Sequence, residues 1–152
     1  LEREAICLDM ASEQRWDVIR TLSDALARLP GMAPAETIAR EVRLREEAAG
    51  TAVGQEMAFP HARMDGLDRA VVAFGRETGG IEWNAPDGVP VHLVFLILTP
   101  KTQDETQVQI LSALARGLAS EDLRRRLRET SDSDAAWAIL REAAAKAATQ
   151  TE

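Results

Sequence analysis

Tyrosine is absent from the 152-residue sequence, and cysteine, histidine and the other aromatic residues are rare. The lone cysteine, Cys7, excludes an internal disulfide and a cysteine-based zinc cluster. Such sparing use of cysteine suits a reducing compartment, so we expect a cytoplasmic protein. Two histidines with no matching carboxylate motif do not make a metal site. Glycine patterns that bind nucleotides are also missing, so we expect neither a metal nor an organic cofactor.

Basic residues are the minority, since 18 lysines and arginines face 25 acidic residues and give a formal net charge of −7. Because a duplex-binding surface normally carries a basic excess, we expect no nucleic-acid partner. Long apolar segments are missing as well. The densest one, residues 89–98, is much shorter than the roughly 18 residues of a membrane span, so we expect no direct membrane insertion.

Hydrophobic residues make up 45% of the chain, which is typical of a globular domain. Their spacing predicts helices at residues 15–29, 34–49, 103–119, 121–130 and 134–148, and strands at 57–59, 70–75, 81–83 and 91–98. Ser12 and Ser120 can cap the first and fourth helices, and the apolar stripes place Leu44 and Val108 on inward faces. Because the last strand is apolar at nearly every position, it needs cover on both sides. The order predicts an α/β fold with a mixed β-sheet sandwiched between helices.

The densest local signal is the segment G-T-A-V-G-Q-E-M-A-F-P-H at residues 50–61. Pro60 fixes the backbone directly before His61, so we expect this histidine at a strand end, on a held but accessible loop. An imidazole held through one ring nitrogen can accept a phosphoryl group on the other. The nearby guanidinium groups of Arg45 and Arg63 suit phosphoryl oxygens. Taken alone, however, a proline–histidine pair is more often a turn without a catalytic role.

The sequence around the Pro60–His61 pair resembles a known family, and this resemblance covers nearly the whole chain. Arg-Glu at 45–46, G-T-A-V-G at 50–54 and A-F-P-H at 58–61 resemble the fructose/mannitol-type EIIA domain (type 2) of the bacterial phosphoenolpyruvate-dependent phosphotransferase system. That family reads roughly R-E-x-x-x-x-T-G-I-G-x-x-x-A-I-P-H at this point. Residues 75–98 agree too, and residues 111–132 resemble the nitrogen-regulatory branch most closely. We therefore expect one EIIA domain over residues 1–152, with its core at about 8–142.

The resemblance implies a fold and an activity. The fold is again a mixed sheet between helices. The histidine that matches His61 accepts a phosphoryl group from HPr or a nitrogen-branch HPr-like phosphocarrier, which makes the domain a phosphocarrier without a cofactor. The partners implied downstream are an EIIB domain, or a transporter or kinase that the domain regulates. The family's loop arginine matches Arg45, its loop threonine matches Thr51, and the basic residue after the histidine matches Arg63.

One departure concerns the second histidine that the family usually carries at the start of the helix after the long strand. The matching residue here is Gln107, whose amide can donate a hydrogen bond but cannot become a cation. His92 lies in phase with the apolar residues of the 91–98 strand. It is either a core histidine paired with a backbone group or a substitute for the missing imidazole.

Two other hypotheses for the function stay open. The first is a non-transferring regulatory domain of the same fold, in one version the C-terminal part of a longer membrane transporter. The second is a metabolite-binding or structural module in which His61 is inert. The arginine run at 124–126 with Arg128 is punctuated by leucines at helical spacing, so we expect a solvated helix face there.

Overall fold

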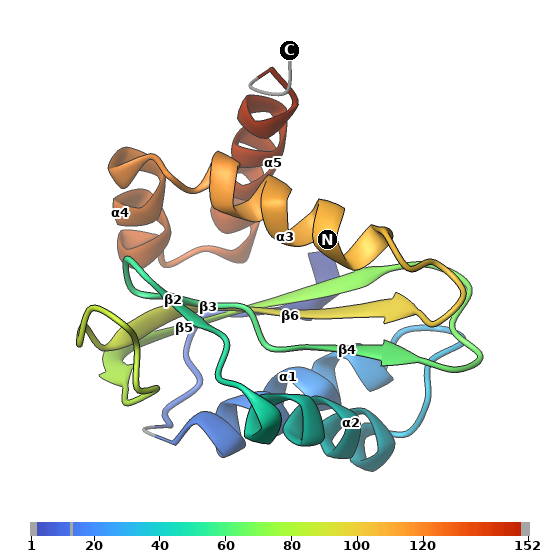
Figure 1. Cartoon of the computed structure of the whole chain (residues 1–152). Coiled ribbons are helices and arrows are strands. Elements are labelled where there is room, and N and C mark those ends of the chain that lie inside the picture. The colour runs from blue at the N-terminus through green and yellow to red at the C-terminus, as the bar shows by residue number, and fades with distance from the viewer. Residues whose placement is uncertain (1–2, 13, 150–152) are drawn as a thin grey trace.

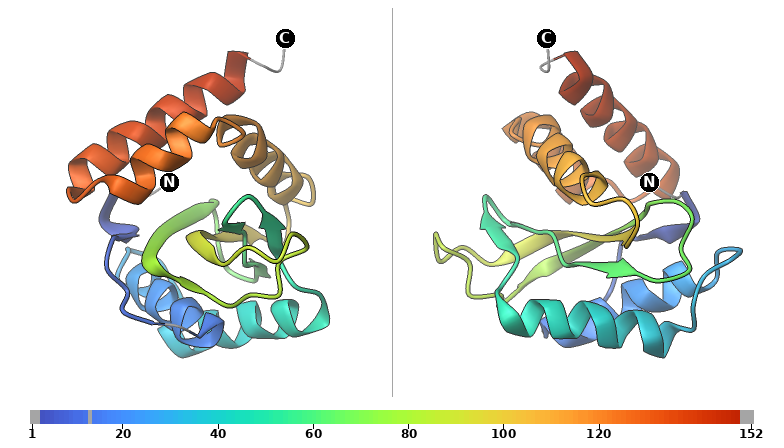
Figure 2. Two further views of the ribbon diagram at one scale, coloured as in Figure 1. Left: turned by 90° about the vertical axis from the view of Figure 1, so that its left-hand side faces the viewer. Right: turned by 45° about the vertical axis from the view of Figure 1, so that its right-hand side comes forward.

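The computed structural model describes residues 3–12 and 14–149, and in this part a mixed sheet lies between two layers of helices (Figure 1). Its helical segments are η1 (Arg3–Ala5), α1 (Arg15–Ala27), α2 (Ala35–Ala48), α3 (Thr106–Gly117), α4 (Glu121–Glu129) and α5 (Ser133–Thr149). The strands are β1 (Ile6–Cys7), β2 (Ala52–Gly54), β3 (Met57–Ala58), β4 (His61–Met64), β5 (Val71–Ile81) and β6 (Val91–Pro100). Helices α1 and α2 cover one face of the sheet, and α3, α4 and α5 lie over the other (Figure 2). The predicted α/β sandwich is therefore confirmed.

Strand β6 is the centre of the sheet. On one side it pairs with β5 in antiparallel register, with Phe74 opposite Phe95. On the other side it pairs in parallel with two short strands in succession, first β3 and then β4. Pro60 stands between those two strands, yet its carbonyl accepts a hydrogen bond of 3.0 Å from the amide of Ile97 in β6. The chain therefore returns to the sheet directly after the proline.

The side chains of β6 alternate between two hydrophobic cores. Val94, Leu96 and Leu98 belong to the core beneath α1 and α2. Phe95 and Ile97 belong to the core that α4 and α5 close. Each fully buried large apolar side chain contributes roughly 1.5–3 kcal/mol, so both cores hold β6 in place. From Leu93 to Leu98 this alternation assigns each residue to one face, whereas Val91, beyond the register shift with β5, lies in the same core as Val94.

Helix α3 packs differently from its neighbours. Of its residues only Gly117, the last one, is buried. A Cβ added there would lie 2.4 Å from the carbonyl oxygen of Ala143 in α5, so the two helices touch backbone to backbone at that point. The other end of α3 borders two surface hollows.

Several local expectations need correction. The cap of α1 is Gln14, while the Ser12 hydroxyl bonds the Gln14 backbone instead of the helix. The expected strands at 70–75 and 81–83 are one strand, β5, which continues past a register shift between Arg76 and Ile81 because β6 lies alongside. Strands β2 and β4 were not expected at all. The Ser120 cap is confirmed, since its side chain accepts from the amide of Leu123.

Burial also differs from the helical stripes at a few positions. Leu44 is 57% exposed and Val108 is 65% exposed, although both were expected to face inward. Both lie beside hollows of the surface rather than under a neighbouring element. Arg124 was expected in a solvated face but is buried, because it donates to the carbonyl of Leu118 and to Glu121. No helix in the described residues combines the length and apolar character that crossing a bilayer requires.

Candidate functional site

His61 is the first residue of β4 and lies opposite Ile97 of β6. Partners in parallel strands share a face, so the imidazole is on the side of the sheet that α3 to α5 cover. The residue is only 5% exposed, which corrects the expected accessible loop. The reason is local. Because the ladder with β6 resumes at the Pro60 carbonyl, His61 is held inside the sheet and not beyond its end.

The imidazole of His61 is oriented by one hydrogen bond. Its Nδ1 lies 2.8 Å from the carbonyl oxygen of Phe59. A carbonyl only accepts, so Nδ1 carries the proton and Nε2 has a free lone pair. Burial lowers the pKa of His61; the Phe59 carbonyl opposes this shift and the positive charge of Arg45 adds to it. The ring is therefore neutral and nucleophilic at neutral pH.

Two adjoining hollows in the surface meet at His61. The first, of about 460 Å³, is bordered by the loop before β2, by Phe59 and by one side of α3. The second, of about 350 Å³, lies between the end of α2, the start of β4 and Gln107 at the start of α3. His61 and Arg45 line both hollows. The structure thus brings His61, Arg45, Thr51, Arg63 and Gln107, all expected at the site, to this one region.

The two arginines differ in what already holds them. Arg45, in the last turn of α2, donates from Nη1 to the carbonyl of Ala49 at 2.7 Å. A guanidinium has five N–H donors, so most of its donors remain for an anion. Arg63 shares the face of His61 two residues along β4, but it forms an ion pair with Asp104. An anion at the second hollow would therefore compete with Asp104 for Arg63.

Gln107, which was matched from the sequence to the family's second histidine, lines the second hollow with His61. Its Oε1 atom is buried and has no hydrogen-bond partner among the described residues. Leaving an acceptor in that state is costly. A half-turn of the amide puts the NH₂ group in the same place, where it can donate to an oxygen of a bound anion.

Thr51 lines the first hollow, but both of its donors point away from it. The backbone N–H donates to Glu46 Oε2 at 2.8 Å, and the hydroxyl donates to Glu46 Oε1. No role was expected for Glu46 from the sequence, although a signal for it exists. Ile38, Val42 and Glu46 are the buried residues of α2 and are spaced four apart, so the glutamate continues the inward stripe.

His92 lies far from His61 along β6. His61 pairs with Ile97, and His92 precedes Ile97 by five residues, or roughly 16 Å along the strand. Its Nδ1 lies 2.9 Å from the carbonyl of Glu77. The first of the two alternatives for His92 is thus confirmed: it is a half-buried histidine that pairs with a backbone group. It cannot act as a second imidazole beside His61.

Comparison with known proteins agrees with this geometry. Residues 1–143 match the model of the family described as phosphoenolpyruvate-dependent sugar phosphotransferase system, EIIA 2. The chain belongs to this EIIA family. The resemblance inferred from residues 45–61 is therefore confirmed, and so is the fold that it implied.

Relatives of this EIIA domain include sugar-specific EIIA components and nitrogen regulatory proteins. A fructose-specific EIIA component from Haloferax volcanii is 41% identical over 98 residues, which are 64% of each chain, so the match spans just under two thirds of that relative. A nitrogen regulatory protein from Bradyrhizobium diazoefficiens is 32% identical over 138 residues, or 90% of this chain and 89% of that one. The solved structure of nitrogen regulatory protein IIA-Ntr from Neisseria meningitidis superposes with a TM-score of 0.85 at 29% identity, covering 91% and 94% of the two chains.

Metal ligands do not gather anywhere in the part of the chain that the structure describes. No three histidine, cysteine or acidic side chains there come close enough to hold an ion.

Proposed function

We propose that the domain is a cytoplasmic phosphocarrier that accepts a phosphoryl group from an HPr-type carrier on Nε2 of His61. The observation that carries this proposal is the state of the imidazole. Its Nδ1 is bound to the Phe59 carbonyl, its pKa is lowered by burial, and its other nitrogen is left free where two hollows meet beside Arg45. Downstream, the group serves regulatory signalling or passes to an EIIB domain.

The transfer step follows from that geometry. The lone pair of Nε2 attacks phosphorus, and the bond from phosphorus to the carrier's leaving atom breaks with its electron pair staying on the carrier. The ring then gains positive charge as the N–P bond forms, and the Phe59 carbonyl stabilises the Nδ1–H. Arg45 lies where it can bind the phosphoryl oxygens, and Gln107 and Arg63 border the same space. No proton has to leave His61 for the group to arrive.

Exposed apolar side chains around the site favour a protein as the donor. Leu44, Val53 and Val108 are 57%, 50% and 65% exposed and line the two hollows. Large apolar side chains on a rim, rather than scattered singly, are typical of a docking surface. A small-molecule ligand is instead buried for most of its surface inside a concave pocket, to which exposed rim side chains add little.

Gln107 favours the regulatory use of the phosphoryl group over rapid relay. A protonated imidazole would stabilise the migrating group with a charge, whereas an amide offers only its dipole. Nitrogen regulatory proteins are among the relatives, and the alignment with one of them covers 90% of this chain. We therefore propose a slow acceptor whose phosphorylation state is read by a second protein.

The test is a labelling assay with phosphoenolpyruvate, enzyme I and HPr or its nitrogen-branch counterpart. The chain should gain one acid-labile phosphate, which His61→Ala abolishes. His92→Ala is the matched control and should leave labelling intact, because His92 lies roughly 16 Å along β6 from Ile97, the strand partner of His61. Labelling that persists in His61→Ala would overturn the assignment. No labelling of the wild-type chain by either carrier would favour the non-transferring regulatory domain.

A further inference from the structure

Glu46 is a buried carboxylate that the transfer step does not use. The residue is 2% exposed, although it follows the half-exposed Arg45 in α2. Oε2 accepts from the Thr51 amide at 2.8 Å and from Trp83 Nε1 at 3.1 Å. Oε1 accepts from the Thr51 hydroxyl, and Arg15 Nη1 is 4.0 Å from Oε2. The carboxylate therefore has partners for both oxygens within the fold.

Such an arrangement fixes geometry more than it adds stability. Burying a carboxylate costs several kcal/mol unless donors surround it, so the donors must stay in place. Two of the three hydrogen-bond donors belong to Thr51. Trp83 is itself 2% exposed and cannot move away from the carboxylate. Glu46 thus anchors Thr51, at the start of the loop that leads to the site.

The anchor is connected to the imidazole by two further hydrogen bonds. The carbonyl of Thr51 accepts from the amide of Phe59 at 3.0 Å. The carbonyl of Phe59 accepts from Nδ1 of His61 at 2.8 Å. The path from the buried carboxylate to the ring is therefore Glu46, Thr51, Phe59, His61, with a hydrogen bond at every step.

We propose that Glu46 is a positioning residue that sets the tautomer and orientation of His61 through Thr51 and Phe59. If Thr51 is released, the Phe59 carbonyl loses the bond that fixes its own residue. The ring can then turn or exchange its proton, and protonation of Nε2 removes the lone pair that attacks phosphorus. Only the kinetic part of this inference rests on the proposed function, because the tautomer is a property of the unphosphorylated protein.

The first experiment measures the tautomer directly by ¹⁵N NMR of the His61 ring in the full chain. The wild-type protein should show the Nδ1–H form almost alone. In Glu46→Gln, the NH₂ group of the new amide meets hydrogen-bond donors that previously bonded to a carboxylate oxygen, so Thr51 is released. We therefore expect the population of the Nε2–H form to rise severalfold over the wild type. Trp83→Phe is the matched control, since it removes one donor of the same cluster and leaves both Thr51 bonds. Trp83→Phe should lose about as much thermal stability as Glu46→Gln, yet the NMR spectrum of its His61 ring should match that of the wild type.

The kinetic arm compares single-turnover phosphorylation by one fixed donor. A displaced ring predicts a rate lower by on the order of tenfold to a hundredfold in Glu46→Gln and near the wild-type rate in Trp83→Phe. If Glu46→Gln does not fold, Thr51→Val tests the same path, because it deletes only the hydroxyl donor; the same change of tautomer should appear to a smaller degree.

Two results would overturn the inference. One is a wild-type ring spectrum in Glu46→Gln or, where that variant fails, in Thr51→Val. The other is an equal change of the His61 tautomer in Trp83→Phe, which would show that any destabilisation of the cluster around Glu46 has the same effect. A wild-type chain that no carrier labels would count against the proposed function, while the NMR arm would still decide the role of Glu46.

Discussion

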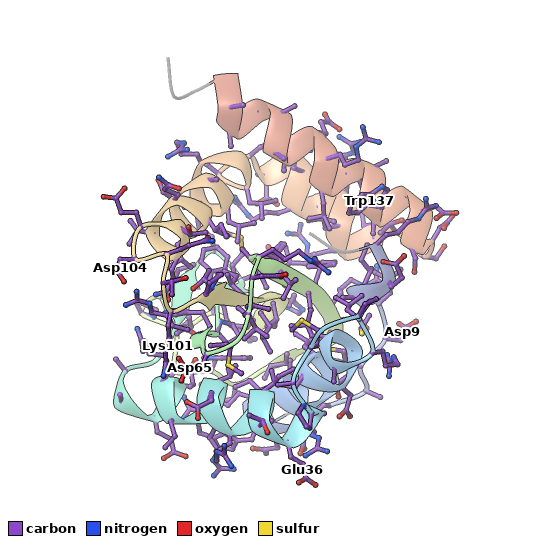
Figure 3. The ribbon with its side chains drawn as sticks, turned by 90° about the vertical axis from the view of Figure 1, so that its right-hand side faces the viewer. Asp9, Glu36, Asp65, Lys101, Asp104 and Trp137 are labelled. Atoms are coloured by element: carbon purple, nitrogen blue, oxygen red, sulfur yellow. The ribbon has the colours of Figure 1, made fainter. Side chains whose placement is uncertain are left out.

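Arg63 on β4, which lines a hollow together with His61, forms an ion pair with Asp104 in the turn before α3. Their side chains are 41% and 83% exposed, so solvent weakens the pair. Asp104 lies on the same side of the molecule as Lys101 and Asp65, which form a second exposed pair (Figure 3). A phosphoryl group on His61 must compete with Asp104 for the guanidinium.

Asp104→Asn should therefore free Arg63 for the phosphoryl group. We expect phosphorylation to be faster, or the phosphoprotein to live longer, by roughly two- to fivefold, the factor that an exposed pair of up to about 1 kcal/mol implies. The measurement is the rate of labelling and of phosphate loss at low salt. Asp65→Asn breaks the neighbouring pair with Lys101 and should change neither rate. Equal effects of the two variants would show that only net charge matters.

Arg45→Ala should slow labelling and shorten the lifetime of the phosphoprotein. Arg45 is the guanidinium that lines both hollows, so its loss removes charge-assisted bonds worth roughly 1.5–3 kcal/mol, or about ten- to a hundredfold in rate. Its bond to the Ala49 carbonyl predicts a stability loss of only about 1 kcal/mol. Arg43→Ala, which breaks an exposed pair with Glu47 in the same helix, is the control. Parallel losses of stability and labelling would make Arg45 a structural residue.

Gln107→His should raise the phosphorylation rate by on the order of tenfold, with His61 still required. A protonated imidazole supplies a charge-assisted bond where the amide supplies a neutral one. Because His92 is five residues from Ile97, the strand partner of His61, and its Nδ1 is bound to the Glu77 carbonyl, adding His92→Ala should leave the gain unchanged. Single-turnover rates with one donor separate chemistry from docking. A gain that disappears in the double variant would contradict the placement of His92.

Stability should depend on pH through His61. Its pKa in the folded protein is lowered from the ordinary value of 6.5, chiefly by burial. The unfolded chain therefore takes up this proton at a higher pH than the folded one, and stability falls as pH drops from 6.5 toward the folded pKa. Urea unfolding at pH 7.5, 6.5 and 5.5 should show a smaller decline in His61→Gln than in the wild type. An identical slope would mean that the buried ring ionises as freely as an exposed one.

The sequence predicted the sandwich and the central strand well, because both depend on local periodicity. The run at 91–98 is apolar at nearly every position, and the structure extends it only to Pro100. Strands β2 and β4 were missed because β2 ends in the loop glycine Gly54 and β4 carries His61 and Arg63, so neither reads as an apolar run. They exist because β3 and β6 supply their hydrogen-bond partners.

The site was predictable as a set of residues but not as a geometry. His61 and Arg45 were named from a motif, yet the burial of His61 depends on β6, far away in the sequence. The spacing of Leu44 and Val108 fits an inward stripe, but it fits an exposed rim equally well. Periodicity defines a face of the helix and does not say what covers that face. Glu46 was overlooked for the opposite reason. A charged residue on an apolar stripe becomes intelligible only with Thr51 and Trp83 beside it.

Helix α3 is in backbone contact with its neighbour only near one end, while Ile110, Leu111 and Leu114 pack against the core as partly buried side chains. Gly117 is fixed against the backbone of α5, while Gln107 is ten residues away, or roughly 15 Å along the axis. A tilt of about 5° at Gly117 would displace Gln107 by roughly 1.3 Å, and misplacement on that scale can change a rate up to about a hundredfold. A binding event or substitution at the α3–α5 crossing can therefore adjust chemistry at His61 without touching it.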